Sequence, residues 1–127
     1  MQFGKEMIDI KYKLEQVGHT IVLPKDIDKY ASGEKTIEGK WEKQEGDLIK
    51  SYWSEIKGSD AVIIVNITKN GVENYVGGNA LIEMAYAHVL NKKIYLLNPV
   101  PEMNYKDEIE AMNPMILNGD LSKISLD

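Results

Sequence analysis

Residues 60–66, Asp60-Ala61-Val62-Ile63-Ile64-Val65-Asn66, place five apolar residues between two polar ones. A short apolar run that is rich in β-branched residues and bounded by turn residues is typical of a strand covered on both faces, as in a parallel sheet. Lys93-Ile94-Tyr95-Leu96-Leu97-Asn98 repeats this pattern and is closed by Pro99. Two such strands with a helical segment between them predict a βαβ unit.

Apolar residues at three- and four-residue spacing predict helices around these strands. The helices cover residues 3–17, 41–57, 79–90 and 105–112, and short runs at 19–23 and 115–117 predict two further strands. Gly18 stands where the first helix is expected to stop. The alternation of helices and strands predicts an α/β fold with a parallel sheet and helices on both faces. The polar residues 24–40 predict a long surface loop.

The composition is that of one globular domain covering residues 1–127, because the chain has 127 residues of which 43% are apolar. The absence of cysteine excludes a disulfide scaffold, a thiolate zinc site and a cysteine nucleophile. With two histidines, an all-histidine metal site is not expected, and we expect neither a metal nor a cofactor. The net charge of −5 argues against binding to the phosphate backbone of nucleic acids.

No apolar run reaches the roughly 18 residues of a membrane span, and the first five residues lack the apolar core of a secretory signal. We therefore expect a cytoplasmic protein that does not bind membranes. A small molecule or another protein is its expected partner.

The carboxyl ends of parallel strands are where open sheets of this kind bind ligands. Asn66 and Asn98 follow two such ends, where an amide can bind a ribose hydroxyl or the edge of a base; loop capping is the alternative for both. Asp60 opens the first of these strands and is a further candidate for substrate binding, with a strand-end cap as the alternative.

A glycine pair precedes the third predicted helix. Gly77 and Gly78 let the backbone approach a ligand closely and aim free N–H groups at it. Asn79 suits the N-cap, and Tyr75 either stacks on a base or covers the loop. Glu83 lies about one turn inside the helix, where the dipole favours the ionised carboxylate by roughly 0.3–1 kcal/mol. Such a carboxylate acts as a nucleophile or stabilises an oxocarbenium ion; an ordinary turn and a helix charge are the alternative.

This order of segments resembles the nucleoside 2-deoxyribosyltransferase-like superfamily, which includes the 2′-deoxynucleoside 5′-phosphate N-hydrolases. The likeness lies in residues 59–65, the glycine pair, Glu83-Met84-Ala85-Tyr86-Ala87 and residues 92–97. It implies a flavodoxin- or Rossmann-like three-layer sandwich with a mostly parallel sheet of four to five strands. It also implies that Glu83 attacks the anomeric carbon of an N-glycoside and releases the base.

Other features of the family fall on further positions of this chain. Tyr52 matches the aspartate that assists the leaving base in the hydrolases, and its hydroxyl can donate a hydrogen bond. Family members begin with a strand and a Gly-Ser loop, and Met1–Met7 resembles the residues just after them. Family sites borrow residues across an interface, which implies a homodimer or larger homo-oligomer, and Ile94–Leu97 and Met112–Leu117 offer apolar surface for it.

The segment Gly77–Glu83 also resembles, less closely, the phosphoribohydrolases of the lysine-decarboxylase-like group, which carry Gly-Gly-x-Gly-Thr-x-x-Glu. Both families act on N-glycosides. The sequence therefore predicts cleavage or deoxyribosyl transfer at the N-glycosidic bond of a (deoxy)nucleoside or nucleotide. The alternative is a non-catalytic nucleotide-binding or interaction module.

Overall fold

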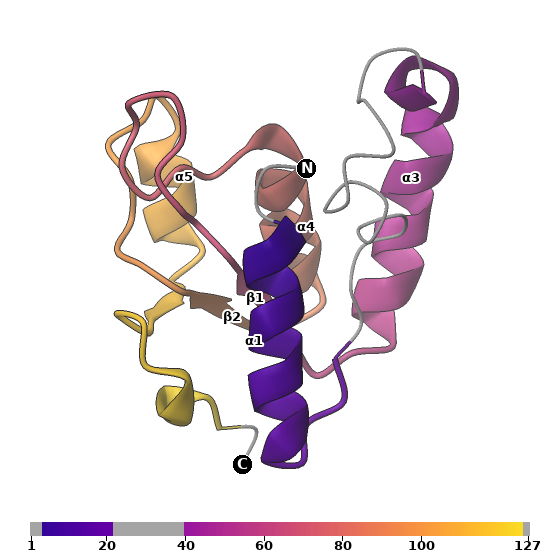
Figure 1. Ribbon diagram of the computed structural model, residues 1–127. Helices are drawn as coiled ribbons and strands as arrows, with labels where there is room; N and C mark the ends of the chain where they lie inside the picture. The colour runs from indigo at the N-terminus through magenta and orange to yellow at the C-terminus, as the bar shows by residue number, and fades with distance from the viewer. Residues whose placement is uncertain (1–3, 22–39, 126–127) are drawn as a thin grey trace. The chain divides into compact units, whose positions relative to one another are not determined.

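The computed structural model describes residues 4–21 and 40–125 and contains a parallel sheet of three strands (Figure 1). The strands are β1 (Ala61–Ile64), β2 (Lys93–Leu96) and β3 (Met115–Ile116), in the order β1-β2-β3. Ala61 pairs with Lys93, and Tyr95 pairs with Met115. Together with its helices, this sheet forms a small α/β fold.

The chain divides into two units, Met1–Tyr52 and Trp53–Asp127. In the first, α1 covers Gly4–Gln16, close to the expected 3–17, and Gly18 follows its end with a φ of 101°, which favours glycine. The predicted strand at 19–23 is not seen in its described part, because His19–Ile21 form no strand; residues 22 and 23 and most of the predicted loop lie outside the described residues. Helix α3 (Lys40–Lys57) continues from the first unit into the second.

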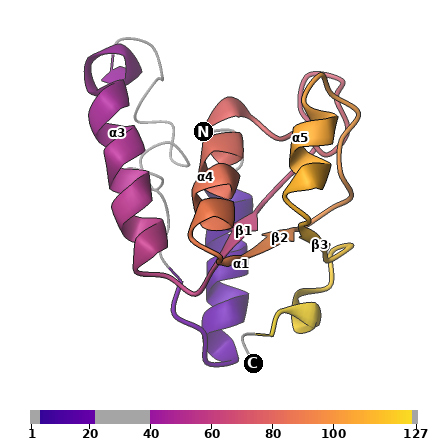
Figure 2. The same ribbon diagram turned by 180° about the vertical axis from the view of Figure 1, so that it is seen from behind.

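In the second unit, α4 (Gly78–Val89) and α5 (Lys106–Ala111) cover the same face of the sheet (Figure 2). In a parallel pair of strands, alternate residues of each strand point to the same face. That face therefore presents Ile64, Ile94 and Leu96. They form one buried cluster with Met84 and Ala87 of α4, Ile109 of α5, Ile56 of α3 and Val76. The strands follow one another across the sheet in the order β1-β2-β3. Right-handed crossovers that step across a sheet in one direction place their helices on the same face, here α4 and α5.

Strand β2 is the central strand of the sheet. Its position contradicts our expectation that its apolar residues are exposed at the surface. We expected Ile94–Leu97 to offer apolar surface to a second subunit. Instead, Ile94, Tyr95 and Leu96 are 6%, 1% and 0% exposed, because strands flank β2 on both sides and the α4 layer covers Ile94 and Leu96. In the other expected stretch, Met115 of the edge strand β3 is 52% exposed.

The C-terminal residues fasten to the opposite face of β2 after a short 3-10 helix, η1 (Leu121–Lys123). The Ser125 carbonyl accepts hydrogen bonds from Lys93 Nζ at 2.6 Å and from the Tyr95 hydroxyl at 2.7 Å. Lys93 and Tyr95 share this face because they are two residues apart in the strand. Among the described helices, none is long and apolar enough to cross a membrane.

Candidate functional site

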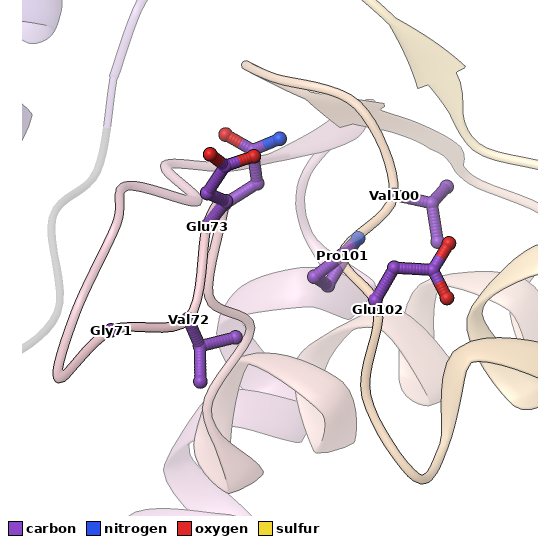
Figure 3. Close-up of a pocket in the computed structure, with 7 residues that line it drawn as sticks. Gly71, Val72, Glu73, Val100, Pro101 and Glu102 are labelled. Atoms are coloured by element: carbon purple, nitrogen blue, oxygen red, sulfur yellow. The ribbon is translucent and has the colours of Figure 1, made fainter.

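The loops that follow β1 and β2 flank an open hollow of about 270 Å³ beyond the carboxyl ends of the strands (Figure 3). Gly71, Val72, Glu73 and Asn74 line it from the β1–α4 loop, and Val100, Pro101 and Glu102 from the β2–α5 loop. This is the edge at which open parallel sheets bind ligands. The glutamates Glu73 and Glu102 come from different loops and are both exposed, and the Glu102 carboxylate points away from the β1–α4 loop (Figure 3).

A tight hairpin shapes one side of the hollow. Lys69 and Val72 exchange two backbone hydrogen bonds of 3.0 and 2.9 Å, with Asn70 and Gly71 at the turn. Both turn residues have positive φ, 51° and 80°, as a two-residue hairpin of this kind requires. Asn-Gly is the characteristic sequence signal for this turn, so the hairpin is a feature that our sequence analysis missed although the signal was present.

Asn66 and Asn98 join the two loops through reciprocal hydrogen bonds. Asn66 is fully buried, and its Nδ2 donates to the carbonyls of Asn98 at 2.8 Å and Pro99 at 3.1 Å. Its Oδ1 accepts from the Asn98 backbone N–H at 2.9 Å, and Asn98 Nδ2 donates to the Asn66 carbonyl at 2.9 Å. Both amide hydrogens of Asn66 are therefore used within the protein. These bonds correspond to loop capping, which we gave as the alternative to ligand binding for Asn66 and Asn98. They also set the spacing of the two loops.

Tyr75 covers the first glycine of the pair. A Cβ built on Gly77 would lie 3.4 Å from the Tyr75 ring, and the Lys69 ammonium stands 5.4 Å from the centre of that ring. The Tyr105 hydroxyl donates to the Val76 carbonyl, and burial, with a smaller contribution from Tyr75, raises the pKa of Tyr105. The segment before α4 is thus held by aromatic side chains, and Tyr75 adopts the covering role that the sequence left as an alternative to base stacking.

The N-cap of helix α4 lies two residues earlier than the sequence suggested. Its N-cap is Gly77, with φ −78° and ψ 172°, and no side chain caps it. Asn79 is therefore not the N-cap, as we had expected, but an exposed residue inside the first turn. The buried Val76 and the packing of Tyr75 on Gly77 place the turn into the helix before Asn79. Gly78 is exposed, and a Cβ on it would meet nothing within 4 Å.

Glu83 lies in the second turn of α4 and is half-buried. Ala80 and Ala87 stand on the same stripe of the helix, and Ala87 is fully buried. Burial, with a smaller contribution from the negative charge of Glu55, raises the pKa of Glu83 from 4.5 to about 7. We had expected the helix dipole to favour ionisation. That expectation was wrong, because the dipole acts mainly within the first turn and desolvation dominates at this position.

Glu55 is a residue of the site that the sequence analysis did not find. It belongs to the last turns of α3. These turns contact α4 at two points. Trp53 packs edge-to-face on Tyr86 with ring centres 5.3 Å apart, and Ile56 joins the buried cluster that contains Met84. Because Glu55 and Glu83 are 28 residues apart on different helices, sequence spacing carries no signal for their proximity.

One predicted residue is not brought to this edge, and another belongs to the other unit of the chain. Asp60 is exposed and precedes β1, so it lies at the amino end of the strand, whereas Asn66 and Asn98 follow carboxyl ends. Tyr52 is buried and belongs to the first unit of the chain, so its role beside Glu83 stays a prediction.

Among the side chains that the structure describes, those of residues 4–21 and 49–125, no group of three His, Asp or Glu is arranged to hold a metal ion. The exposed Glu102 carboxylate instead pairs with Lys106 at 2.6 Å. Comparison of the chain with protein-family models, curated proteins and solved structures found no match.

Proposed function

We propose that this chain cleaves the N-glycosidic bond of a (deoxy)nucleoside or nucleotide, or transfers its deoxyribosyl group, with Glu83 as the nucleophile. The observation that carries the proposal is the environment of Glu83. Its carboxyl is half-buried on α4, and no hydrogen bond or ion pair to it is found in the described part of the chain. A desolvated carboxyl without a partner is costly for stability, and groups with strongly shifted pKa values are concentrated at functional sites.

The chemistry of a carboxylate at a glycosidic carbon suits this position. The Glu83 carboxylate attacks the anomeric carbon, the carbon–nitrogen bond breaks, and its electron pair leaves with the base, which takes up a proton. Water then attacks the same carbon, and the bond between that carbon and the Glu83 oxygen breaks, so that its electron pair restores the carboxylate. The attacking water loses a proton, and the sugar is freed. A second base in place of water gives transfer. With a pKa of about 7, roughly half of the Glu83 carboxyls are ionised at neutral pH.

The finer assignment of fold and family is part of the proposal. The described β1-α4-β2-α5-β3 order supports a flavodoxin- or Rossmann-like architecture in the nucleoside 2-deoxyribosyltransferase-like superfamily. A sheet of four to five strands, a homodimer or larger homo-oligomer, and Tyr52 as the group that assists the leaving base are proposed on the same basis. Gly77, Gly78, Asn79, Tyr75 and Asn98 are the residues proposed near the substrate, and Asn66 acts by holding the loops.

Release of free base is the test of this function. The purified chain is incubated with ribonucleosides, 2′-deoxyribonucleosides and their 5′-monophosphates, and free base is separated by chromatography. We expect release that is lost in Glu83→Gln. The matched control is Glu108→Gln, which changes an exposed carboxylate of α5, and we expect it to keep full activity. Release that survives in Glu83→Gln would contradict the proposed role of Glu83.

A non-catalytic nucleotide-binding module is the second candidate. The observation that favours it is that both amide hydrogens of Asn66 bind the protein itself, while Asp60 lies at the other end of β1. Saturable nucleoside or nucleotide binding by a folded chain that releases no base from any substrate would favour this candidate.

A further inference from the structure

Two asparagines of the chain, Asn70 and Asn118, are followed directly by glycine. We propose that Asn70 is a site of deamidation, in which its side-chain amide becomes a carboxylate, and that the fold protects Asn118 from the same reaction. The reaction needs only water, so it does not depend on the activity proposed for Glu83. It alters one side of the hollow, because Gly71 belongs to the lining.

Deamidation at such a pair begins with the backbone nitrogen of the glycine. This nitrogen attacks the carbonyl carbon of the asparagine side chain, a new carbon–nitrogen bond forms, and the bond from that carbon to the side-chain nitrogen breaks. Ammonia leaves with the proton of the backbone N–H, and a succinimide ring remains. Water then opens the ring at either carbonyl, which gives aspartate or isoaspartate, whose backbone is one carbon longer. Glycine favours the attack because it has no Cβ to block the approach.

The two Asn-Gly pairs have nearly the same φ angles. Asn70 and Gly71 have φ of 51° and 80°, and Asn118 and Gly119 have φ of 51° and 78°. All four residues are exposed to solvent. These angles and the access of water therefore do not separate the two sites. The difference lies in the hydrogen bonds of the attacking nitrogen.

At Asn70 the attacking nitrogen belongs to Gly71 and is not bound to the sheet. In the part of the chain that the structure describes, no hydrogen bond from the Gly71 N–H is found. The hairpin is closed by the two backbone bonds between Lys69 and Val72, and the residues at its tip are exposed. Segments held by few, exposed backbone hydrogen bonds open locally at a low cost in free energy. The peptide group between Asn70 and Gly71 can therefore rotate for the attack while the sheet stays intact.

At Asn118 the attacking nitrogen is bound next to the central strand. The Gly119 N–H donates a hydrogen bond to the Leu97 carbonyl at 2.8 Å. The preceding residue, Leu117, is fully buried, and its N–H donates to the Leu96 carbonyl at 2.8 Å. The Gly119 N–H must leave its acceptor before its nitrogen can attack, and breaking bonds between backbone groups packed against a sheet costs free energy. We therefore expect the fold to slow deamidation at Asn118.

Deamidation of Asn70 changes the hairpin in two ways. It adds a negative charge at position 70, next to Lys69. The isoaspartate product also lengthens the turn by one backbone carbon, whereas the two bonds between Lys69 and Val72 depend on a two-residue turn of defined geometry. Because Gly71 and Val72 line the hollow (Figure 3), the shape of this side changes as the protein ages.

Ageing of the intact chain tests the proposal. The folded chain, and the same chain unfolded in guanidinium chloride, are kept in mildly alkaline buffer, digested at acidic pH and analysed by peptide mass spectrometry. In the unfolded chain we expect Asn70 and Asn118 to convert at similar rates, because both precede glycine. In the folded chain we expect Asn118 to convert at least about tenfold more slowly than Asn70, because its turn must first release hydrogen bonds. Chromatographic separation of the aspartyl and isoaspartyl peptides distinguishes the two products.

Two variants serve as controls, and three results would overturn the proposal. Asn70→Asp lacks the reacting amide, so its residue 70 should show no change of mass. Glu83→Gln should age as the wild-type chain does, so failure of the proposed function leaves this result unaffected. Equal conversion of Asn70 and Asn118 in the folded chain contradicts the proposal, as does slower conversion of Asn70. The same ratio of rates in the unfolded chain also overturns it, because local sequence and not the fold would then separate the sites.

Discussion

At the scale of the single residue, the chemistry of Glu83 is decided by its position on α4. A carboxyl in the first turn would have the free N–H groups and the dipole beside it. Glu83 lies one turn further on, between Ala80 and Ala87 on a stripe that packs toward the core, so desolvation raises its pKa to about 7. The carboxyl is thereby held near the point where small changes in pH alter its charge.

The first prediction concerns stability and pH. Because the folded-state pKa of Glu83 is about 7 against an ordinary 4.5, the folded state binds the proton more tightly than the unfolded state. The resulting stabilisation is complete below pH 4.5 and is lost as pH rises through 7, with an upper limit of about 3 kcal/mol. Glu83→Gln should therefore be more stable than wild type at pH 8 and nearly equal to it at pH 5. Urea unfolding at both pH values measures this, with Glu108→Gln as control.

The second prediction concerns the influence of Glu55 on Glu83. Glu55→Gln removes a nearby negative charge, so the pKa of Glu83 should fall while staying above 4.5, because burial is the larger cause of the shift. Carbon-detected NMR titration of the Glu83 carboxyl measures this directly. Base release, which needs the ionised nucleophile, should reach its plateau at lower pH in the variant. Glu108→Gln, on the exposed side of α5, should change neither value. An unchanged Glu83 pKa in Glu55→Gln would show that the two carboxyls do not interact.

At the scale of the element, the Asn66–Asn98 hydrogen bonds join the loops that follow β1 and β2. Because the Asn66 side chain makes more of these bonds than the Asn98 side chain, we expect its replacement to cost more stability. Asn66→Ala leaves the Asn98 N–H and two carbonyls without their buried partner, and we expect a loss of about 2–4 kcal/mol of unfolding free energy. Asn98→Ala removes a single side-chain bond to the Asn66 carbonyl and should cost about 1 kcal/mol. Urea unfolding of both variants measures the difference; equal losses would contradict the assigned bonds.

A fourth prediction tests the attachment of the C-terminal residues to β2. Tyr95→Phe keeps the buried ring but removes the hydroxyl that donates to the Ser125 carbonyl at 2.7 Å. We expect a loss of about 1 kcal/mol of stability, together with faster amide hydrogen exchange at residues 121–125. Tyr12→Phe, at a 64% exposed tyrosine, is the matched control and should leave both quantities unchanged.

The elements also show what local sequence can predict. The three- and four-residue spacing predicted α1 and α4 to within a few residues, because one apolar face must be buried. The N-cap of α4 was predicted two residues late, because the packing of Tyr75 on Gly77 decides where the helix begins. The strand predicted for residues 60–66 shortens to Ala61–Ile64, because Asn66 leaves the ladder to bind Asn98 and Pro99.

At the scale of the whole molecule, the alternation of apolar runs and helical segments predicted the parallel α/β arrangement that the described residues show. The composition of the site was harder to predict. Glu83, Asn66 and Asn98 were named from their places at a helix start and at strand ends. Glu55 and the pairing of the loops depend on contacts between residues about 30 positions apart, for which no local pattern exists.

The central claim is that Glu83 forms a covalent bond to the sugar, and the mass of the enzyme during turnover tests it most directly. The chain is mixed with its best substrate, quenched in acid within the first turnovers and examined by intact and peptide mass spectrometry. We expect a mass increase equal to one glycosyl residue, located on the peptide that contains Glu83 and missing in Glu83→Gln. Base release by an enzyme that stays unmodified, at a rate that Glu83→Gln does not change, would contradict it.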